Sequence, residues 1–276
     1  MTTVDTGTPD LVAEISEGVA VLTMNRPTRR NALSPAMLEA LGRMLAQMEL
    51  DVDVRCVVLT GAGGAFCAGG DVKRFAAAPT GAAGTAEGRT IDDAIQLQRL
   101  SQRATSGRLW SMSKPTIAAI SGPAAGAGLS LALACDLRYA VEGAVLTTAF
   151  ARVGLAGDYG GTWLLSQIVG AGRAKELFLF SERIDAVKAA QWGIVNEVFP
   201  EAEFEQAVMS RAQRLANGPS IALRYMKENL NRAALGEFNE CMDLEVTHHV
   251  HTATTADHHE AAQAFVEKRE PLFRGR

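Results

Sequence analysis

Twice in this chain of 276 residues, an apolar run that predicts a buried strand leads directly into a glycine-rich turn. The first run is "VRCVVLTG" at 54–61, which continues into "GAGGAFCAGGD" at 61–71. The second is "TIAAISG" at 116–122, followed by "PAAGAG" and then by the apolar helix "LSLALACD". Nearly unbroken apolar strands are typical of parallel sheets that are covered on both faces. The repetition therefore predicts an α/β fold built from stacked β–β–α units.

The segments around these two units fit the same pattern. The run at 18–27 predicts a strand, and Ser34 followed by Pro35 is typical of a helix start. A long helix is expected from Asp92 to about residue 112. Residues 76–90 are small and aperiodic, which predicts a mobile loop or the edge of a lid.

The character of the chain changes in its last third. Beyond about residue 172 the strand signal nearly vanishes, and most segments show the spacing of amphipathic helices. We therefore expect a strand-containing core over 10–200 and a helical region over 201–276, and a helical tail of this kind often packs against partner subunits.

Composition and charge limit the class of protein. The formal net charge of −4 argues against general nucleic-acid binding, because phosphate backbones require a basic surface. The four cysteines have no CxxC spacing and lie in or beside apolar runs, which predicts buried, reduced thiols. The N-terminal "MTTVDTGTPD" lacks a signal-peptide pattern, and no apolar run approaches the roughly 20 residues of a membrane span. We expect a cytoplasmic protein with neither a nucleic-acid nor a membrane partner.

The two glycine-rich turns have a possible chemical use. Each follows a buried strand, so both are expected at the same edge of a sheet. The second turn opens directly into a helix, whose N-terminus presents free N–H groups and a partial positive charge. Two backbone donors that converge on one point can stabilise a developing oxyanion. A tight connection with no chemical role remains the alternative for each turn taken singly.

Six motifs in this order resemble those of the crotonase, or enoyl-CoA hydratase/isomerase, superfamily. They run from about residue 18 to 276 and read "NRPTRRNALS", "LTGAGGAFCAGGD", "KPTIAAISGPAAGAGLSLALACDLRYA", "GLAGDYGGTWLL", "AQWGIVNEV" and "AFVEKREPLFRGR". The resemblance implies a spiral of ββα units with a C-terminal α-helical oligomerisation region that forms trimers, often paired into hexamers. It also implies an enzyme that binds acyl-CoA thioesters and stabilises their enolate anions, with the N–H groups of Ala68 and Gly126 forming the oxyanion hole.

The resemblance further implies a set of substrate-binding residues. They are Arg30, Ala32, Ala68, Gly69, Gly70, Asp71, Gly126, Phe150, Phe265 and Lys268. Arg29, Arg30, Lys73 and Arg74 flank the expected thioester path and could hold the phosphates of CoA, although each can equally be an ordinary exposed charge. Phe265 and Lys268 correspond to residues that reach the adenine end of CoA, often from a neighbouring subunit; helix packing and a surface lysine are the alternatives. The CoA thioester is then a substrate, and no separate cofactor is expected.

The acidic residues decide which reaction this site performs. Hydratases of the superfamily use two glutamates to activate water, and the corresponding positions here are Ser130 and Phe150. Isomerases, including those resembling ring 1,2-epoxyphenylacetyl-CoA isomerase, have an aspartate at the position of Asp158 in "GLAGDYGGT". One base suffices to move a double bond, and burial beside apolar residues such as Phe150 and Leu155 should raise its basicity. The alternative role for Asp158 is to cap the helix that begins near Gly160.

Three functions therefore stay open. The first is an enoyl-CoA isomerase or a ring-opening relative with Asp158 as its base. The second is a hydratase with relocated acids, for example Glu142 or an acid of segment 87–93, and the third is a non-catalytic acyl-CoA-binding subunit. A dehalogenase of the superfamily would need a histidine near the first turn, but the first histidine in this chain is His248. We expect the five histidines of the tail to be solvated and to form no metal site.

Overall fold

A seven-stranded sheet forms the centre of the molecule in the computed structural model, which describes residues 1–71 and 90–276. Its strands, in spatial order, are β1 (Thr2–Val4), β2 (Leu11–Ser16), β3 (Val19–Met24), β4 (Cys56–Gly61), β5 (Thr116–Ile120), β7 (Leu137–Val141) and β10 (Glu197–Phe199). β1, β2 and β3 pair antiparallel, whereas the pairs from β3 to β10 are parallel. The predicted strands at 18–27, 54–61 and 116–122 are confirmed as β3, β4 and β5.

A second, smaller sheet contains β6 (Ala124–Ala125), β8 (Val145–Thr147) and β9 (Ile184–Asp185). Single β-bridges extend it, one between Leu33 and Gly70 and one between Cys67 and Ala124. After β3, β5 and β7 the chain thus passes through a short extended segment before it enters the next helix. This alternation confirms the expected spiral of ββα units.

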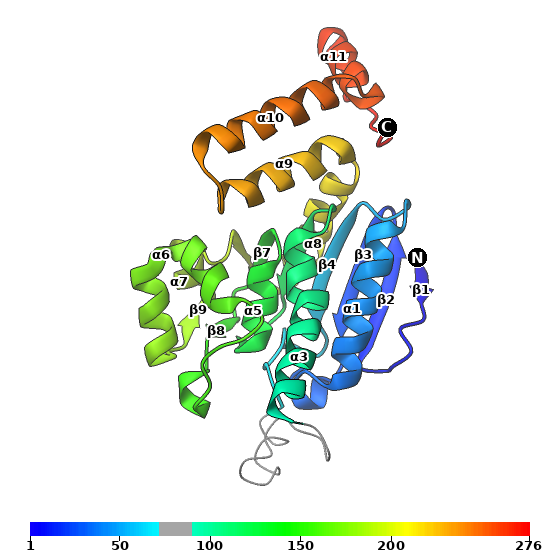
Figure 1. The fold of residues 1–276 in the computed structure, drawn as a ribbon. Coiled ribbons are helices and arrows are strands. Elements are labelled where there is room, and N and C mark those ends of the chain that lie inside the picture. The colour runs from blue at the N-terminus through cyan, green and yellow to red at the C-terminus, as the bar shows by residue number, and fades with distance from the viewer. Residues whose placement is uncertain (72–89) are drawn as a thin grey trace.

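Helices cover the central sheet (Figure 1). They are α1 (Pro35–Leu50), α3 (Ile91–Gln102), α4 (Arg108–Ser111), α5 (Ala127–Ala134), α6 (Gly161–Phe180), α7 (Ala186–Gln191) and α8 (Glu201–Ala216), with short 3₁₀ turns at Pro27–Arg29 and Ala151–Val153. Ser34 caps α1 as predicted, since its hydroxyl accepts a hydrogen bond from the Met37 N–H at 3.1 Å. The expected helix from Asp92 to about 112 is present as α3 and α4, joined by a π-helical turn over Arg103–Gly107.

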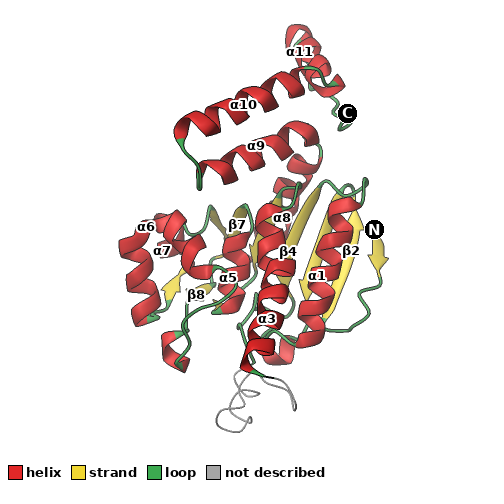
Figure 2. Cartoon of the chain, viewed as in Figure 1, coloured by secondary structure: helices red, strands yellow, loops and turns green. Residues whose placement is uncertain are grey.

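The last three helices form an arm beyond the sheet (Figures 1 and 2). They are α9 (Ser220–Ala233), α10 (Phe238–Ala253) and α11 (Ala256–Glu267). α8, by contrast, buries Phe204, Val208 and Ala212 and packs against β3, β4 and β7. Because α8 packs on the sheet, the core extends to about residue 216. We expected its boundary at residue 200 from the sequence.

An ion pair between a buried lysine and a half-buried aspartate fastens the arm to the core. Lys227 of α9 lies 2.8 Å from Asp136 and also donates hydrogen bonds to the carbonyls of Leu109 and Lys114. Thr116 at the start of β5 donates to the same carboxylate.

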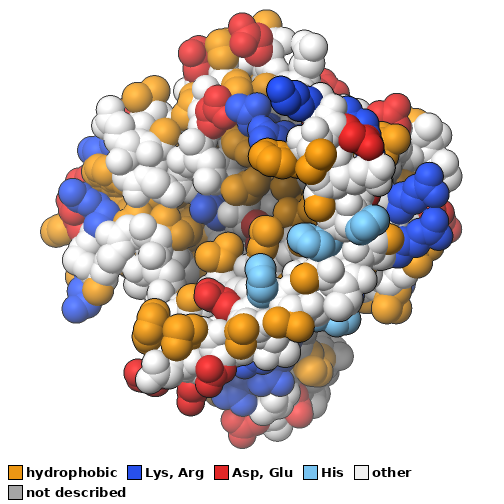
Figure 3. Space-filling model, turned by 90° about the horizontal axis from the view of Figure 1, so that it is seen from above, with side chains coloured by type: hydrophobic (Ala, Val, Ile, Leu, Met, Phe, Trp, Pro, Cys, Tyr) orange, Lys and Arg blue, Asp and Glu red, His pale blue; other side chains and the backbone are white. Residues whose placement is uncertain are grey.

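Seen from above, apolar and histidine side chains surround a hollow in this region (Figure 3). Among the described residues, no helix has both the length and the apolar character that crossing a membrane requires.

The predicted loop at 76–90 falls almost wholly on residues 72–89, which lie outside the described part of the chain, as do Lys73 and Arg74.

The histidines only partly match the expectation of solvated side chains. His248 is 9% exposed, stacks on Tyr225 with 4.2 Å between ring centroids, and has Nδ1 2.6 Å from the Asn229 amide oxygen. Its burial follows from its position on the face of α10 that packs on α9.

Gly128 tests the packing of this core because a side chain there would collide with the first glycine-rich turn. An ideal Cβ at Gly128 would lie 2.3 Å from the carbonyl oxygen of Cys67, which no real Cβ contact tolerates. We expect Gly128→Ala to lower the free energy of unfolding by at least about 2 kcal/mol. Gly172→Ala is the matched control: this α6 glycine has no atom within 4 Å of the added carbon, so alanine there should stabilise by about 0.5–1 kcal/mol. Equal stabilities in urea titrations would contradict this packing.

Candidate active site

The two glycine-rich segments run side by side at one edge of the fold. The carbonyl of Pro123 accepts hydrogen bonds from the N–H groups of Phe66 and Cys67 at 3.1 and 3.2 Å, and the Cys67 carbonyl accepts one from Ala125 at 2.9 Å. Their backbones approach so closely that only glycine fits at two positions. An ideal Cβ at Gly69, whose φ is +83°, would lie 2.6 Å from the Ala125 oxygen, and Gly128 is equally restricted.

The structure corrects the expected pair of oxyanion donors. The Ala68 N–H donates to the Arg30 carbonyl at 2.9 Å, and the Gly126 N–H donates to the Thr147 carbonyl at 3.1 Å. Both N–H groups already donate to backbone carbonyls of segments that are distant in the sequence. Neither is therefore free to bind a thioester oxygen.

Two neighbouring amides are free instead. Ala127 is the first residue of α5, so its N–H belongs to the helix end that has no intrahelical acceptor. Within residues 1–71 and 90–276, neither the Ala127 N–H nor the Gly70 N–H has an acceptor at hydrogen-bond distance. The segments that carry them are adjacent: an ideal Cβ at Gly69 would lie 3.3 Å from the Ala127 nitrogen.

Asp158 lies on a segment that packs onto α5. Gly161, three residues later, is so close to Ser130 of α5 that an added Cβ would be 2.3 Å from the serine hydroxyl oxygen. Ser130 in turn donates from that hydroxyl to the Gly126 carbonyl at 3.3 Å. Through these contacts, the segment that carries Asp158 packs on α5 within one helical turn of the free Ala127 amide.

The Asp158 side chain is half-buried, and its carboxyl has no partner among the described residues. Its Oδ1 atom is inaccessible to water and has no hydrogen-bond partner among the described residues. Burial alone raises the pKa of this carboxyl from its usual range to about 6. A capping carboxylate would accept a hydrogen bond from a backbone N–H of the first turn, but the cap residue of α6 is Gly160 and no side chain caps this helix. The capping role that the sequence left open is therefore wrong.

The other acids considered from sequence are placed differently. Glu142 is exposed on the turn between β7 and β8. Asp93 forms a capping box with Thr90 at the start of α3, and Asp92 beside it is exposed. The two hydratase positions hold buried, non-ionisable side chains, since Ser130 is 2% exposed and Phe150 is 5% exposed. Glu87 lies outside the described residues.

An apolar wall lies beside the second turn. The Phe150 ring stacks in parallel on Phe178 with centroids 5.8 Å apart, and an ideal Cβ at Gly126 would be 3.8 Å from it. This wall contains no group that could hold a proton, whereas Asp158 belongs to the segment that packs onto α5.

The remaining expected binding residues fall into two groups. Arg30 and Asp71 flank the first turn: Arg30 is exposed and its carbonyl holds Ala68, while the Asp71 carboxylate lies 3.5 Å from Arg26. Ala32 is buried beside them, with its carbonyl accepting from Arg26 at 2.6 Å. Phe265 is 85% exposed and Lys268 ends α11, at the far end of the arm, so within one chain they do not join the turns (Figure 1).

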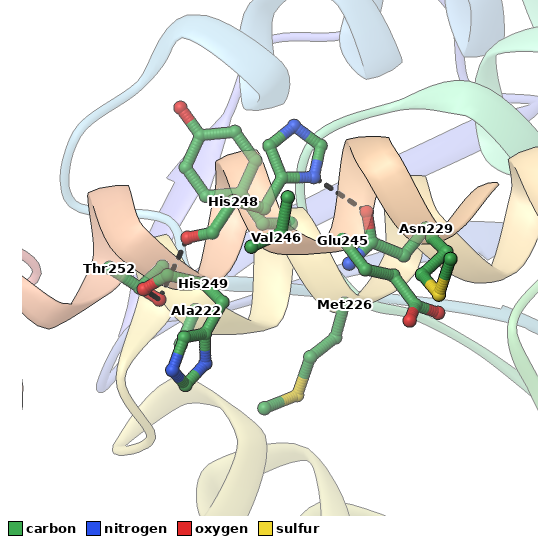
Figure 4. Close-up of a pocket in the computed structure, with 10 residues that line it drawn as sticks. Ala222, Met226, Asn229, Glu245, Val246, His248, His249 and Thr252 are labelled. Atoms are coloured by element: carbon green, nitrogen blue, oxygen red, sulfur yellow. Dashed lines mark hydrogen bonds between the residues drawn. The ribbon is translucent and has the colours of Figure 1, made fainter. Parts of the chain in front are cut away.

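A separate pocket lies in the arm between α9 and α10 (Figure 4). It has a volume of about 430 Å³ and is lined by side chains such as Met226, Asn229, Glu245 and His249. None of the residues expected to bind acyl-CoA lines it. The described residues contain no group of three or more histidine, cysteine or carboxylate side chains that could hold a metal ion.

The sequence model of the enoyl-CoA hydratase/isomerase family matches residues 14–276. The chain belongs to this family. It is 38% identical over 263 residues to a probable enoyl-CoA hydratase of Rhodobacter capsulatus, covering 95% of this chain and 97% of that protein. It is 35% identical over 266 residues to the 1,2-epoxyphenylacetyl-CoA isomerase of Escherichia coli, with 96% and 98% covered.

Solved structures agree with the family assignment. The crystal structure of an enoyl-CoA hydratase from Bacillus anthracis superimposes with a TM-score of 0.86 at 32% identity, covering 97% of this chain and all of that one. The fold is therefore crotonase-like, as the motifs implied, and the protein is an acyl-CoA-processing enzyme of the enoyl-CoA hydratase/isomerase superfamily. The names of its relatives include both reactions, so the chemistry must be argued from the site.

The raised pKa of Asp158 makes a prediction about stability. Between about pH 4 and 6 the folded protein holds a proton that the unfolded chain has released, so wild-type stability falls as pH rises through this window. Asp158→Asn removes that loss. The variant should match wild type near pH 4 and be more stable near pH 7.5, by at most about 3 kcal/mol.

Asp185→Asn is the control for this measurement, because Asp185 is the exposed cap of α7 and asparagine caps equally well. Its stability relative to wild type should change little with pH. A pH-independent difference for Asp158→Asn, measured by chemical unfolding across pH 4 to 7.5, would show that the carboxyl is not desolvated.

Proposed function

We propose that this enzyme shifts a carbon–carbon double bond in an acyl-CoA thioester, in the manner of an enoyl-CoA isomerase, with Asp158 as its single base. The observation that carries this proposal is the half-buried Asp158 carboxyl, whose Oδ1 atom is inaccessible to water and has no hydrogen-bond partner among the described residues, and whose pKa is raised to about 6. The two positions that supply hydratase acids hold Ser130 and Phe150, and neither side chain can activate water.

The free amides of Gly70 and Ala127 are the proposed oxyanion donors. Deprotonation beside a thioester places negative charge on its carbonyl oxygen, and two preorganised N–H groups stabilise that charge without reorganising. The partial positive charge at the start of α5 adds to this effect. Ala68 and Gly126 then act as structural neighbours, since their own N–H groups hold the two segments in place.

The reaction follows from these positions. The Asp158 carboxylate removes a proton from C2 of a 3-enoyl thioester, and the electron pair of that bond delocalises over the dienolate and its oxygen. Protonated Asp158 then donates the proton to C4, the electron pair returns through the carbon chain, and the double bond lies between C2 and C3. A carboxyl with a pKa near 6 suits both steps, because it is mostly ionised at neutral pH yet readily holds a proton.

The coenzyme is proposed to run along the first turn. Gly69, Gly70 and Asp71 would follow the thioester, and the exposed Arg30, with Ala32 behind it, lies at the same edge to meet phosphate groups. Gly126 and Phe150 would border the acyl group on the other side. Phe265 and Lys268 would contact the adenine end only from a neighbouring subunit, because they lie on the distant end of the arm.

We also propose that the arm assembles copies of this chain into a trimer or hexamer. α9, α10 and α11 leave large apolar side chains in solvent, which include Met226, Leu230, Phe238, Met242, Val246, Val250, Phe265 and Val266. A stable monomer seldom exposes so much apolar surface in one region. Light scattering at micromolar concentration should give three or six times the mass of the chain, and a monomer would refute the proposal.

The catalytic role of Asp158 is tested by Asp158→Asn, which preserves size but removes the proton acceptor. Isomerisation of 3-enoyl-CoA should fall by 10²-fold or more, while CoA binding and folding persist. Asp185→Asn, a conservative change at an exposed cap, should keep the wild-type rate.

The products identify the reaction class. Incubation of wild type with 3-enoyl- and 2-enoyl-CoAs in heavy water, read by mass spectrometry, should give a shifted double bond with no added oxygen. Addition of water to 2-enoyl-CoA would establish a hydratase instead. Tight binding with no turnover of either class would establish a binding subunit, and an undiminished rate in Asp158→Asn would remove Asp158 from the mechanism.

A further inference from the structure

The backbone that carries Asp158 adopts an unusual turn. The Gly161 N–H donates to the Asp158 carbonyl at 3.0 Å, which closes a four-residue turn over 158–161. Both central residues have positive φ, +50° for Tyr159 and +75° for Gly160. Such type I′ turns strongly favour glycine, asparagine or aspartate, and a bulky side chain at the first central position crowds the backbone. The tyrosine must therefore be held in this conformation by contacts elsewhere.

Those contacts reach a different element. The Tyr159 ring is only 3% exposed, and its hydroxyl makes polar contacts with the side chains of Ser101 and Gln98 on α3. Burial raises the pKa of Tyr159 to about 12, so the phenol stays neutral and keeps these polar contacts throughout the physiological pH range. Tyr159 thus ties the turn to a helix that is far from it in the sequence.

Nothing else on this segment can serve as an anchor. The residues at 157, 160 and 161 are glycines, so Tyr159 is the one large side chain between Gly157 and Thr162. Gly157 also has a positive φ, of +113°. The Asp158 carboxyl cannot orient itself by its own hydrogen bonds, because Oδ1 has no partner among the described residues. Its direction is set by the backbone of the turn.

We propose that Tyr159 is a positioning residue: by fastening the turn to Ser101 and Gln98, it directs the Asp158 carboxyl toward the reacting carbons. The inference rests on the proposed role of Asp158 as the base. It assigns to α3 a part in catalysis that does not involve contact with the substrate.

Tyr159→Phe tests this inference, because it removes the hydroxyl and leaves the ring to fill its site. A base held in the wrong place loses rate with little change in substrate binding, so kcat should fall roughly 10-fold or more while KM stays within about twofold. Ser101→Ala should lower kcat in the same direction. Tyr139→Phe, at a buried tyrosine of β7 that stacks edge-on against Phe199, should leave kcat unchanged.

A double-mutant cycle separates positioning from general destabilisation. If Tyr159 acts through Asp158, Tyr159→Phe should lower kcat in wild type but have no further effect in Asp158→Asn. An unchanged kcat in Tyr159→Phe would overturn the inference, and so would an equal fold-loss in both backgrounds. Either result would leave the role of Asp158 itself intact.

A second readout does not depend on turnover. Carbon-13 NMR of labelled aspartate, assigned with Asp158→Asn, reports the titration of this carboxyl. In wild type it should titrate near pH 6, and in Tyr159→Phe near the ordinary value of about 4, because the relaxed turn admits water. If Asp158→Asn proves fully active, the proposed function fails and this titration alone decides on Tyr159: an unchanged pKa in Tyr159→Phe overturns its positioning role.

Discussion

The close parallel approach of two backbone segments, 66–70 and 123–128, is the constraint on which the site depends. The Pro123 and Cys67 carbonyls pair the segments, and Gly69 and Gly128 allow them to touch because a Cβ at either position would strike a carbonyl oxygen. This contact brings the end of the first turn beside the start of α5. This geometry leaves two N–H groups without acceptors among the described residues, since neighbouring amides are used to hold the segments together.

The second constraint is the partial burial of a carboxyl group that no described residue pairs. Folding removes the Oδ1 atom of Asp158 from water without a hydrogen-bond partner among the described residues, although an unpaired buried polar atom costs free energy. Asp136, a half-buried acid at the junction with the arm, is by contrast paired with Lys227 and Thr116 and fastens the arm. Asp136 is therefore a structural carboxylate, whereas the Asp158 carboxyl remains able to accept a proton. The free energy of folding that is lost at Asp158 is consistent with a functional site, because residues at such sites often sacrifice stability for their chemical role.

Sequence predicted the architecture well and the site only approximately. The buried strands and the Ser34 cap were readable because local pattern determines them, and the spiral followed from the repeated turns. The donor pair was misplaced at Ala68 and Gly126, because the availability of an N–H depends on carbonyls of Arg30 and Thr147 that no local pattern specifies. The role of Tyr159 is not visible in the sequence either, because the residues that its hydroxyl contacts lie on α3, far from it in the chain. The β2 strand was missed, although its alternating "LVAEIS" carries a strand signal.

The central claim is that a thioester oxygen binds between the Gly70 and Ala127 amides with Asp158 facing the carbons beside it. A crystal structure of Asp158→Asn with a bound 3-enoyl-CoA tests it most directly. The account predicts that the oxygen lies within about 3.2 Å of both amide nitrogens and that residue 158 faces C2 and C4 of the acyl group. An oxygen farther than about 3.5 Å from either nitrogen, or an acyl chain remote from residue 158, would contradict it.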